Sequence, residues 1–484
     1  MIASLNDKGV MATVMPHGVL FRGGAEKVIR EGIVRANIIE AIISLPPNLF
    51  YGTGIPACIL VINRNKPKSL DNKIVFINAD AEYGEGRAQN YLRPEDIEKI
   101  TFVFDNKREV PKYSRLVELS EIKKHDFDLN IRRYVDNSPD PEIEDVHAHL
   151  VGGVPRQEIA LYQQEFRRYG LTGDVMFDRK DENYCLFKPA IKTRSQIKEA
   201  IEAHPAVAAE NKKMDDALAR WWESARHAIE ALPKHNKVAK FRRESIELLK
   251  KQFGEIDVLD EFQHAGIFVN WWEGVRWDMK TIVSSGWSPS LIPDDYIKNA
   301  FFKKELDEID LLEANAAEAD SELSEMLDEI EIDDNDEEEN GKTVRAIKSY
   351  LKEQIADLKE AVTDSAKTET AALMKTLEAI EAKEKELKTT KRSQKEKEEE
   401  LEMKVEAKRK TFTEAEAKGL VLDKFYDLAR KETYRYLNSR KRRIVGILEK
   451  LWDKYQIPLM DLSTSRDRSG AEVDRFLKAL HYLE

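Results

Sequence analysis

Four short apolar runs near the start of the chain constrain its fold more than any other feature. They are VMATVM at 10–15, IIEAIISL at 38–45, ACILVI at 57–62 and IVFI at 74–77. Continuous apolar runs of roughly four to eight residues, bounded by Gly, Pro or Asn, suit strands that are buried on both faces. Between the first two runs, GAEKVIREGIV at 24–34 has apolar residues at helical spacing. The order strand, helix, strand predicts an α/β sheet.

Beyond this zone the sequence is mostly helical. The loop NSPDPE at 137–142 opens a region that contains the pairs Trp221–Trp222 and Trp271–Trp272. Paired tryptophans on helices are usually core anchors and only sometimes a base-stacking surface. The composition predicts five parts. They are a partial α/β domain at 1–136, a Trp-rich helical extension at 137–304, an acidic linker at 305–341, a coiled coil at 342–418 and a basic helical segment at 419–484.

Heptad spacing begins at Leu351. The apolar residues are Leu351, Ile355, Leu358 and Val362, then after a slip in phase Leu373, Leu377, Ile380 and Leu387, and finally Leu401, Val405 and Phe412. A sustained repeat of this kind predicts a coiled coil, and the slip is a stutter. The polar stretch at 388–400 is where we expect an antiparallel helical hairpin to turn. The pattern leaves open whether the coiled coil pairs with itself or with another chain.

The net charge of −12 is unevenly distributed. Eighteen Asp or Glu and no Lys or Arg lie between Glu305 and Gly341, so the rest of the chain carries a net charge of +6. The overall charge therefore does not exclude a nucleic-acid partner. The acidic run fits a solvated linker or helix face, and alternatively a segment that competes with DNA for a basic patch.

Several classes of protein are disfavoured. Two cysteines, Cys58 and Cys185, exclude a disulfide framework and a cysteine-based zinc site. The sequence lacks a long apolar segment and a signal-peptide pattern, so we expect a cytoplasmic protein with no membrane partner. No GxGxxG, GxxxxGK[ST], HExxH or GxSxG motif occurs. His147 and His149 flank an alanine beside Asp145, which fits a surface loop better than a metal site. These observations alone do not name a reaction.

Four blocks of the N-terminal zone resemble one family. They are MATVMPHGVLFRGGAEKVIREGIV at 11–34, NIIEAIISLPPNLFYGTGIPACILVINRNK at 37–66, KIVFINADAEYGEGRAQNYLRPEDIEKI at 73–100 and KKHDFDLNIRRYV at 123–135. In order and spacing they are similar to the modification subunit of type I restriction–modification systems. The resemblance covers about residues 1–155 strongly, and the Trp-rich region resembles the extension of longer members.

This resemblance implies an adenine-N6 DNA methyltransferase that uses S-adenosylmethionine and has a mostly parallel sheet covered by helices on both faces. The family's glycine-rich cofactor loop and its Asn-Pro-Pro-aromatic tetrapeptide are not in this sequence, and LPPN at 45–48 is not that tetrapeptide. We therefore expect α/β followed by all-α, with the α/β part being the C-terminal part of the methyltransferase sheet. The strand at 10–15 would then be an interior parallel strand left with an open apolar edge. A truncated or split chain is expected, and a complementing N-terminal polypeptide is one expected partner.

The resemblance also implies site residues on the target-base side. Adenine must leave the stack and lie against an aromatic ring, for which Phe50 is preferred over Tyr51. Either ring could instead pack in the core. Arg87, Gln89 and Asn90 match the family's R-x-Q-N block and could position phosphate or only stabilise a turn. Arg22 follows a strand-end loop and is a weaker phosphate candidate.

A basic stretch near the C-terminus, RKETYRYLNSRKRR at 430–443, is a further DNA candidate. It could equally neutralise the acidic run or meet an acidic partner helix. The residues expected to contact DNA here are Arg440, Lys441, Arg442 and Arg443. No catalytic, cofactor-binding or metal residue is assigned.

The favoured interpretation is a modification subunit of a type I restriction–modification complex. Its expected partners are double-stranded DNA, a specificity subunit whose long helices could pack on the coiled coil, and a restriction subunit. One alternative is a non-catalytic interaction or DNA-binding subunit of the same kind of complex. Another is a coiled-coil scaffold with an unrelated α/β head, which the four matching blocks disfavour.

Overall fold

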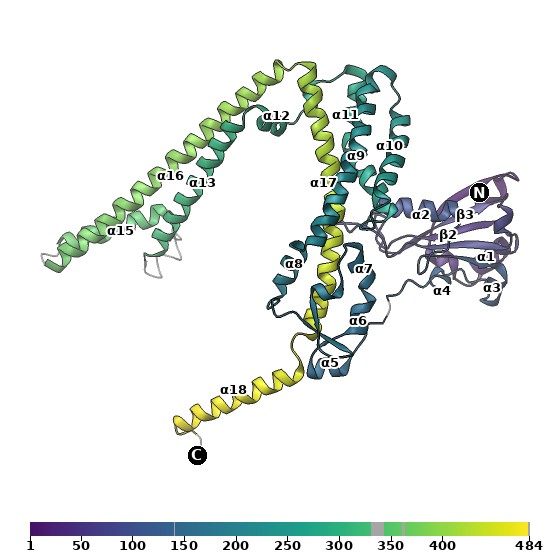
Figure 1. Ribbon diagram of the computed structural model, residues 1–484, viewed down its shortest axis with the longest axis horizontal. Coiled ribbons are helices and arrows are strands. Elements are labelled where there is room, and N and C mark those ends of the chain that lie inside the picture. Colours follow the sequence, from purple (N-terminus) through teal and green to yellow (C-terminus); the bar gives the residue numbers. More distant parts are fainter. Residues whose placement is uncertain (140, 331–342, 361–363, 483–484) are drawn as a thin grey trace. The chain divides into compact units, whose positions relative to one another are not determined.

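The structure, a computed structural model, describes residues 1–139, 141–330, 343–360 and 364–482. Two compact units divide the chain, Met1–Lys280 with Tyr426–Glu484 and Thr281–Phe425. Figure 1 labels many of the elements along the chain. The five-part division predicted from the sequence stays a prediction.

The first unit begins with a five-stranded sheet in the order β1-β3-β2-β4-β5. Only β2 and β4 pair as parallel neighbours, and the other three pairs are antiparallel. The strands are β1 (Val10–Pro16), β2 (Ile39–Ser44), β3 (Ala57–Asn63), β4 (Lys73–Asn78) and β5 (Ser114–Glu118). The four predicted apolar strands and the helix between the first two are thus confirmed.

Helices cover both faces of this sheet. Along β4, Ile74 and Phe76 belong to one buried cluster, whereas Val75 and Ile77 belong to the other. This alternation is expected for a strand that is buried on both sides. The first cluster includes residues of α1 (Ala25–Arg35), α3 (Leu119–Lys124) and α4 (Ile131–Tyr134), and the second includes residues of α2 (Pro94–Asn106).

The expectation of a mostly parallel sheet is wrong for this segment. Strand β3 returns directly after β2 through residues 45–56, with no crossover helix, and lies antiparallel between β1 and β2. Strand β1 is antiparallel to β3 and forms an edge, so it is not an interior parallel strand. Val10 and Val14 of this strand are 59% and 51% exposed and lie on one face of the sheet.

The rest of the first unit is largely helical, as predicted, with the tryptophans mostly in its core. Trp221 and Trp271 are fully buried, and their rings meet edge to face at 5.1 Å. A small sheet in the order β6-β8-β7 interrupts the helical region and was not predicted. The elements are α5 (Val146–Val151), β6 (Val154–Pro155), α6 (Arg156–Leu161), α7 (Gln163–Arg168), β7 (Phe177–Arg179), β8 (Tyr184–Phe187), α8 (Arg194–Glu202), α9 (Pro205–His235), α10 (Val238–Phe253), α18 (Leu459–Ala479), and most of α11 (Glu261–Ser285) and α17 (Glu414–Tyr455).

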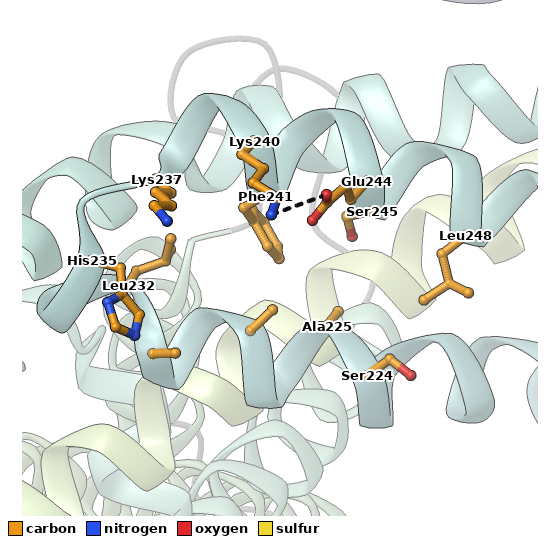
Figure 2. A pocket seen from close by; sticks show the side chains of 12 residues that line it. Ser224, Ala225, Leu232, His235, Lys237, Lys240, Phe241, Glu244, Ser245 and Leu248 are labelled. Atoms are coloured by element: carbon orange, nitrogen blue, oxygen red, sulfur yellow. Dashed lines mark ion pairs between the residues drawn. The ribbon is translucent and has the colours of Figure 1, made fainter.

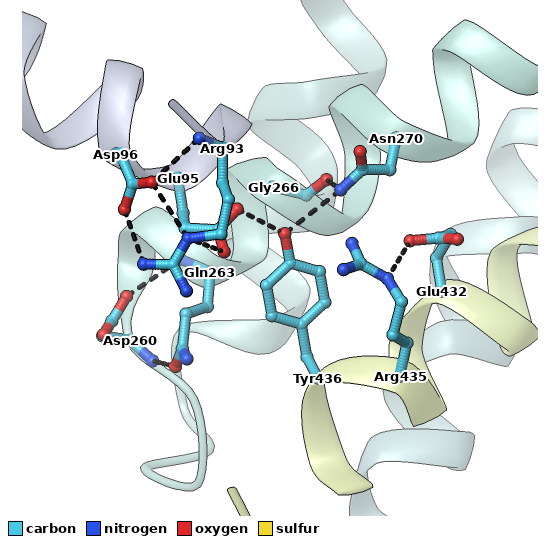
Figure 3. Close-up of polar contacts among 10 residues, drawn as sticks. All are labelled: Arg93, Glu95, Asp96, Asp260, Gln263, Gly266, Asn270, Glu432, Arg435 and Tyr436. Carbon is cyan, nitrogen blue, oxygen red and sulfur yellow. Dashed lines mark hydrogen bonds and ion pairs between the residues drawn. The ribbon is translucent and has the colours of Figure 1, made fainter. Parts of the chain in front are cut away.

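Tyr436 joins the α/β part to the helices inside this unit. Its hydroxyl donates to Glu95 of α2 at 2.6 Å and accepts from the Asn270 side chain of α11 at 3.1 Å (Figure 3). Asp96 in turn holds Arg93 through the Nε and Nη2 atoms of the guanidinium, at 2.9 and 2.8 Å. Residues 341 positions apart thus share one partly buried polar contact.

Gly266 is what lets Tyr436 approach α11. A Cβ atom at this position would lie 2.2 Å from the Tyr436 hydroxyl oxygen. Gly266→Ala is therefore expected to lower the free energy of unfolding by about 1–3 kcal/mol, as overpacking typically does. Chemical unfolding followed by circular dichroism measures this loss. Gly274→Ala is the control, because a Cβ there meets only Leu428 at 3.9 Å; equal losses would contradict the prediction.

The second unit consists of helices packed along α16. Ion pairs join Glu305 to Lys404 at 3.2 Å and Glu322 to Lys383 at 2.5 Å, so α13 runs antiparallel to α16. The helix α15 is also antiparallel to α16, because Lys348 pairs with Glu384 and Lys352 with Glu381. The elements of this unit are α12 (Asp294–Phe301), α13 (Lys303–Asp328), α15 (Val344–Glu360) and α16 (Asp364–Lys410).

The predicted turn at 388–400 is wrong, because α16 continues through it. Its Lys, Glu and Gln residues are good helix formers, and pairs such as Arg392–Glu396 add support at i,i+4 spacing. Several predicted seam residues are buried, namely Leu351, Ile355, Ile380, Leu387, Leu401 and Val405. Val362 lies outside the described residues, and supercoiling of these helices stays a prediction.

Most of the described part of the acidic run is helical. Residues 305–328 belong to α13, which buries Ile309, Ala316, Ala319, Leu323 and Leu327 and exposes most of its carboxylates. This agrees with a solvated helix face rather than a linker. Residues 331–341 of the run lie outside the described residues.

Candidate functional site

Three loops meet at one edge of the five-stranded sheet. Strands β1, β2 and β4 run in the same direction, so the loops that follow them, at 17–24, 45–56 and 79–93, start at the same edge. The His17 amide donates to the Pro56 carbonyl at 3.3 Å, and the Ala79 amide donates to the Ser44 carbonyl at 3.3 Å. Open α/β sheets bind ligands at the carboxyl ends of their strands, so this edge is the candidate site.

His17 is the titratable group at the end of β1. Its Nε2 atom lies 3.2 Å from the Ser44 hydroxyl at the end of β2. Burial lowers the pKa of His17, and this effect exceeds the opposing effects of a hydrogen bond at the Ala57 backbone and of the Asp80 charge. His17 is consequently neutral at neutral pH and can serve as a hydrogen-bonding group rather than a cation.

Asp80 is the carboxylate just beyond the end of β4. It is 8% exposed and accepts two hydrogen bonds from Arg132, with Nε at 3.3 Å and Nη2 at 3.1 Å. Asn137 donates to its other oxygen at 2.5 Å. A buried carboxylate must be paired, and here a guanidinium and an amide satisfy it. Neither Asp80 nor Arg132 was singled out from the sequence, because their contact spans 52 positions.

The two predicted stacking residues lie on the loop after β2. Phe50 is 39% exposed and Tyr51 is 91% exposed, and a short backbone bridge joins Phe50 to Thr53. Neither ring is a core residue, which was the alternative left open for each. Both rings are accessible, and the bridge constrains the backbone at Phe50.

Of the residues Gln89 and Asn90, only Asn90 makes hydrogen bonds to that loop. The Asn90 amide nitrogen of the backbone donates to the Asn48 carbonyl at 2.9 Å, and its side chain donates to the Pro47 carbonyl at 2.8 Å. Gln89 is half-buried, and its Nε2 atom has no hydrogen-bond partner among the residues described. Asn90 thus stabilises the loop that carries Phe50, whereas the Arg87 side chain is exposed.

Arg22 lies on the loop after β1. Its side chain is 64% exposed, and it packs over Gly18, where a Cβ would lie 2.7 Å from the guanidinium carbon. The Oε1 atom of Glu26, in the first turn of α1, lies 3.8 Å from the Arg22 guanidinium. Arg22 is accessible at the same edge of the sheet as Phe50, and its phosphate contact stays a prediction.

The basic stretch on α17 is largely engaged in ion pairs. Arg440 is 8% exposed and pairs with Glu165 at 2.8 Å, so its burial argues against a phosphate contact. Arg443 shares Glu165 at 3.5 Å, although its side chain is 64% exposed. Lys441 is half-buried and Arg442 is exposed. The stretch therefore joins α17 to α7 more than it presents charge to a ligand.

A second basic surface was missed in the sequence. Residues 231–243, ALPKHNKVAKFRR, contain five Lys or Arg and no acidic residue. They connect α9 to α10, and beside them a groove of about 330 Å³ lies between these helices (Figure 2). Its lining is mainly apolar, with His235, Lys237 and Lys240 toward one end. The run itself was the signal that could have found this surface.

The remaining sequence candidates have structural explanations. Asp145 caps α5 by accepting a hydrogen bond from the Ala148 amide at 3.0 Å. The His147 ring stacks on the Tyr184 ring with 4.9 Å between their centres, and the His149 Nε2 atom lies 3.1 Å from a Glu144 carboxylate oxygen. No metal-binding group of three or more His, Cys, Asp or Glu occurs in the described part of the chain. Burial raises the pKa of the Cys58 thiol to about 11. Within the described residues, no helix has the length and apolar character needed to cross a membrane.

The α/β segment is similar to a known family. Residues 1–142 match the family model described as N-6 DNA Methylase, and these residues include the sheet and its three loops. The N-terminal region of this chain is thus similar to N-6 DNA methylases. The matched segment contains Arg22, Phe50, Arg87, Gln89 and Asn90.

Similarity extends to curated relatives and to a solved structure. The chain is 45% identical over 136 residues to the type I restriction enzyme MjaVII methylase subunit of Methanocaldococcus jannaschii, covering 28% of this chain and 23% of that protein. It is 35% identical over 142 residues to the MpnII methylase subunit of Mycoplasma pneumoniae, covering 29% and 26%. A type I restriction–modification methyltransferase subunit from Streptococcus thermophilus is 38% identical over 27% of each chain, with a TM-score of 0.26. The chain therefore spans about a quarter of the length of the curated relatives it matches.

Proposed function

We propose that this chain acts as a modification subunit of a type I restriction–modification system. The proposed reaction transfers a methyl group from S-adenosylmethionine to N6 of adenine in double-stranded DNA. The observation that supports it most directly is the match of residues 1–142 to N-6 DNA methylases. The accessible loops at the carboxyl edge of the sheet supply the surface on which a flipped base would rest.

The residues of this edge do not fit the methyl donor by themselves. Ribose hydroxyls of such cofactors are commonly held by a carboxylate at the end of a strand. The carboxylate at this edge, Asp80, is buried and already occupied by Arg132 and Asn137. We therefore assign the donor site to a complementing polypeptide and assign only the target-base side to this chain.

On the target-base side, Phe50 is the stacking residue. Asn90 fixes the backbone of its loop at Pro47 and Asn48. His17 lies at the start of the neighbouring loop as a neutral hydrogen-bonding group. An extruded adenine stacked on Phe50 would leave its edge free for polar groups of the site.

Phe50→Ala tests the proposed role in a complex reconstituted with the partner subunits. Because base–aromatic stacking contributes roughly 1–3 kcal/mol, methyl transfer to DNA should fall about 5- to 150-fold. The affinity for S-adenosylmethionine should change much less, since the ring contacts the base. Tritium transfer from labelled cofactor measures the first quantity and calorimetry the second. Phe301→Ala is the control, because Phe301 is 40% exposed but lies on α12; unchanged methylation by Phe50→Ala would reject the stacking role.

The proposed partners are a specificity subunit and a restriction subunit, besides DNA. The packing of α13 and α15 on α16 covers much of the heptad seam expected to receive the specificity subunit. The helix α18 is different, because none of its residues is buried and Leu459, Met460, Val473 and Phe476 are more than half exposed. If a partner helix packs on this chain, α18 offers the more accessible apolar surface.

A non-catalytic DNA-binding subunit is the second candidate, and the occupied state of Asp80 favours it. Titration of S-adenosylmethionine into the purified chain alone should show no binding if the donor site lies elsewhere. Adding the complementing polypeptide should then restore binding and methyl transfer. Restored binding without methyl transfer would favour the non-catalytic subunit, and binding by the chain alone would contradict the argument from Asp80.

A further inference from the structure

We propose that the α9–α10 connection, residues 231–243, is a sequence-independent contact to the DNA phosphate backbone. This basic tip carries Lys234, Lys237, Lys240, Arg242 and Arg243. The inference rests on the proposed function in that DNA is the substrate. It adds a binding surface outside residues 1–142, the segment that matches the methylase family.

The positive charge of the basic tip is largely uncompensated. All five side chains belong to exposed residues, and only Lys240 has an ion pair among those described, with Glu244 at 3.5 Å. On α17, by contrast, Arg430, Arg435, Arg440 and Arg443 each lie within 4 Å of a carboxylate oxygen. Only uncompensated cations can replace the counterions of DNA without first breaking a pair. The basic tip therefore fits phosphate binding better than the predicted stretch on α17.

The local fold presents these cations on a rigid support. The helix α9 ends at His235, Asn236 takes a left-handed conformation with φ of 46°, and α10 begins at Val238. Below the tip, Leu232 and Phe241 are buried between the two helices. Because the hairpin is anchored by this packing, the cations project from its end without a large ordering cost on binding.

The distribution of the charges favours DNA over an acidic polypeptide in the α9–α10 groove. Lys237 and Lys240 line that groove, but Lys234, Arg242 and Arg243 do not. A peptide seated in the groove would leave those three cations without a partner. The DNA backbone is continuous and carries one charge per about 1.7 Å of helix axis, so it can engage cations around the whole end of the hairpin.

The test is the salt dependence of duplex binding by the full chain. The tip variant carries Lys234→Gln, Lys237→Gln, Arg242→Gln and Arg243→Gln. The control variant carries Lys192→Gln, Lys198→Gln, Lys212→Gln and Lys251→Gln, which removes the same charge from exposed positions of α8 to α10 and the preceding loop. Fluorescence anisotropy with a labelled duplex, at salt concentrations between about 50 and 200 mM, gives the affinity and its slope.

Each phosphate contact contributes about 0.9 to the slope of log affinity against log salt, so the tip variant should lose about 2–4 from that slope. It should also bind at least tenfold more weakly at the lowest salt concentration. The control variant should keep the wild-type slope, and all three proteins should have the same circular dichroism spectrum and melting temperature.

Three results would overturn the inference. They are equal slopes for the tip variant and the wild type, no duplex binding by the wild type at the lowest salt concentration, and tighter binding of poly-L-glutamate than of duplex through the same four residues. The last result would indicate an acidic polypeptide partner. Methyl transfer in the reconstituted complex is measured separately. The two hypotheses can fail separately. If the tip variant has a reduced slope but the wild-type complex transfers no methyl group, the proposed DNA contact is supported and the proposed function is rejected.

Discussion

Replacing Trp221 with alanine is expected to lower the free energy of unfolding of the helical core by about 3–5 kcal/mol. The indole is fully buried, and it meets Trp271 and Phe268 edge to face at 5.1 and 6.3 Å. Its Nε1 atom donates to the Ser245 carbonyl of α10 at 3.0 Å. Alanine would leave a cavity and remove the hydrogen bond to the Ser245 carbonyl, and both changes cost free energy. Chemical unfolding followed by far-ultraviolet circular dichroism measures the loss.

Trp277→Ala is the matched control for this loss. Trp277 lies on the same stretch of helix as Trp271 but is 61% exposed, with the Lys280 ammonium 4.1 Å from its ring centre. Removing it forfeits a surface cation–π contact of about 0.5–1 kcal/mol. A loss at Trp277 as large as that at Trp221 would contradict the assignment of Trp221 to the core.

The strands were predictable because their signal is local. The run at 38–45 is apolar throughout, and every residue of β2 is buried. The order of the strands was not predictable in this way, since the insertion of β3 between β1 and β2 depends on which edges pair. Periodicity reports the faces that a strand buries and carries no information on the direction of its neighbour.

The long helices likewise have features that could be predicted from the sequence and features that could not. The seam residues Leu351, Ile380 and Val405 are buried as the heptad spacing predicts. The turn placed at 388–400 failed because a polar stretch can continue a helix when its residues favour one and form pairs along it. In α13, the dense carboxylates of the acidic run obscured a buried stripe that includes Ala316, Ala319 and Leu323.

The candidate site was predictable where a single loop defines it. Phe50 and Asn90 lie on loops at the expected edge of the sheet, because both loops follow predicted strands. Arg440 was misjudged because its ion-pair partner, Glu165, is 275 positions away. Composition identifies a cation, but only the fold decides whether a carboxylate already neutralises it.

His264 should make the stability of the helical core fall at acid pH. Its side chain is 3% exposed on α11, and the ring lies edge to face with Phe253 at 5.4 Å. Burial lowers the pKa of His264 from 6.5 to about 4, the nearby Asp260 charge opposes this shift and the Lys250 charge adds to it. Arg167, Arg168, Asp257 and Glu261 are the other charged residues lining the cavity beside it. Between about pH 4 and 6.5, His264 therefore binds a proton more readily in the unfolded chain than in the folded chain.

The sign of this linkage gives a specific expectation for pH titration. The contribution of His264 to the free energy of unfolding is fully present above about pH 6.5. As the pH falls toward about 4, the free energy of unfolding decreases by on the order of 3 kcal/mol. His264→Leu should remove most of that loss, and at pH 7 it should cost little, because the buried Nε2 atom has no hydrogen-bond partner among the described residues. His235→Leu, at an exposed position, should keep the wild-type profile. Unfolding midpoints measured across this pH range decide the matter, because a His264→Leu profile that matches the wild type would show that other groups cause the acid loss.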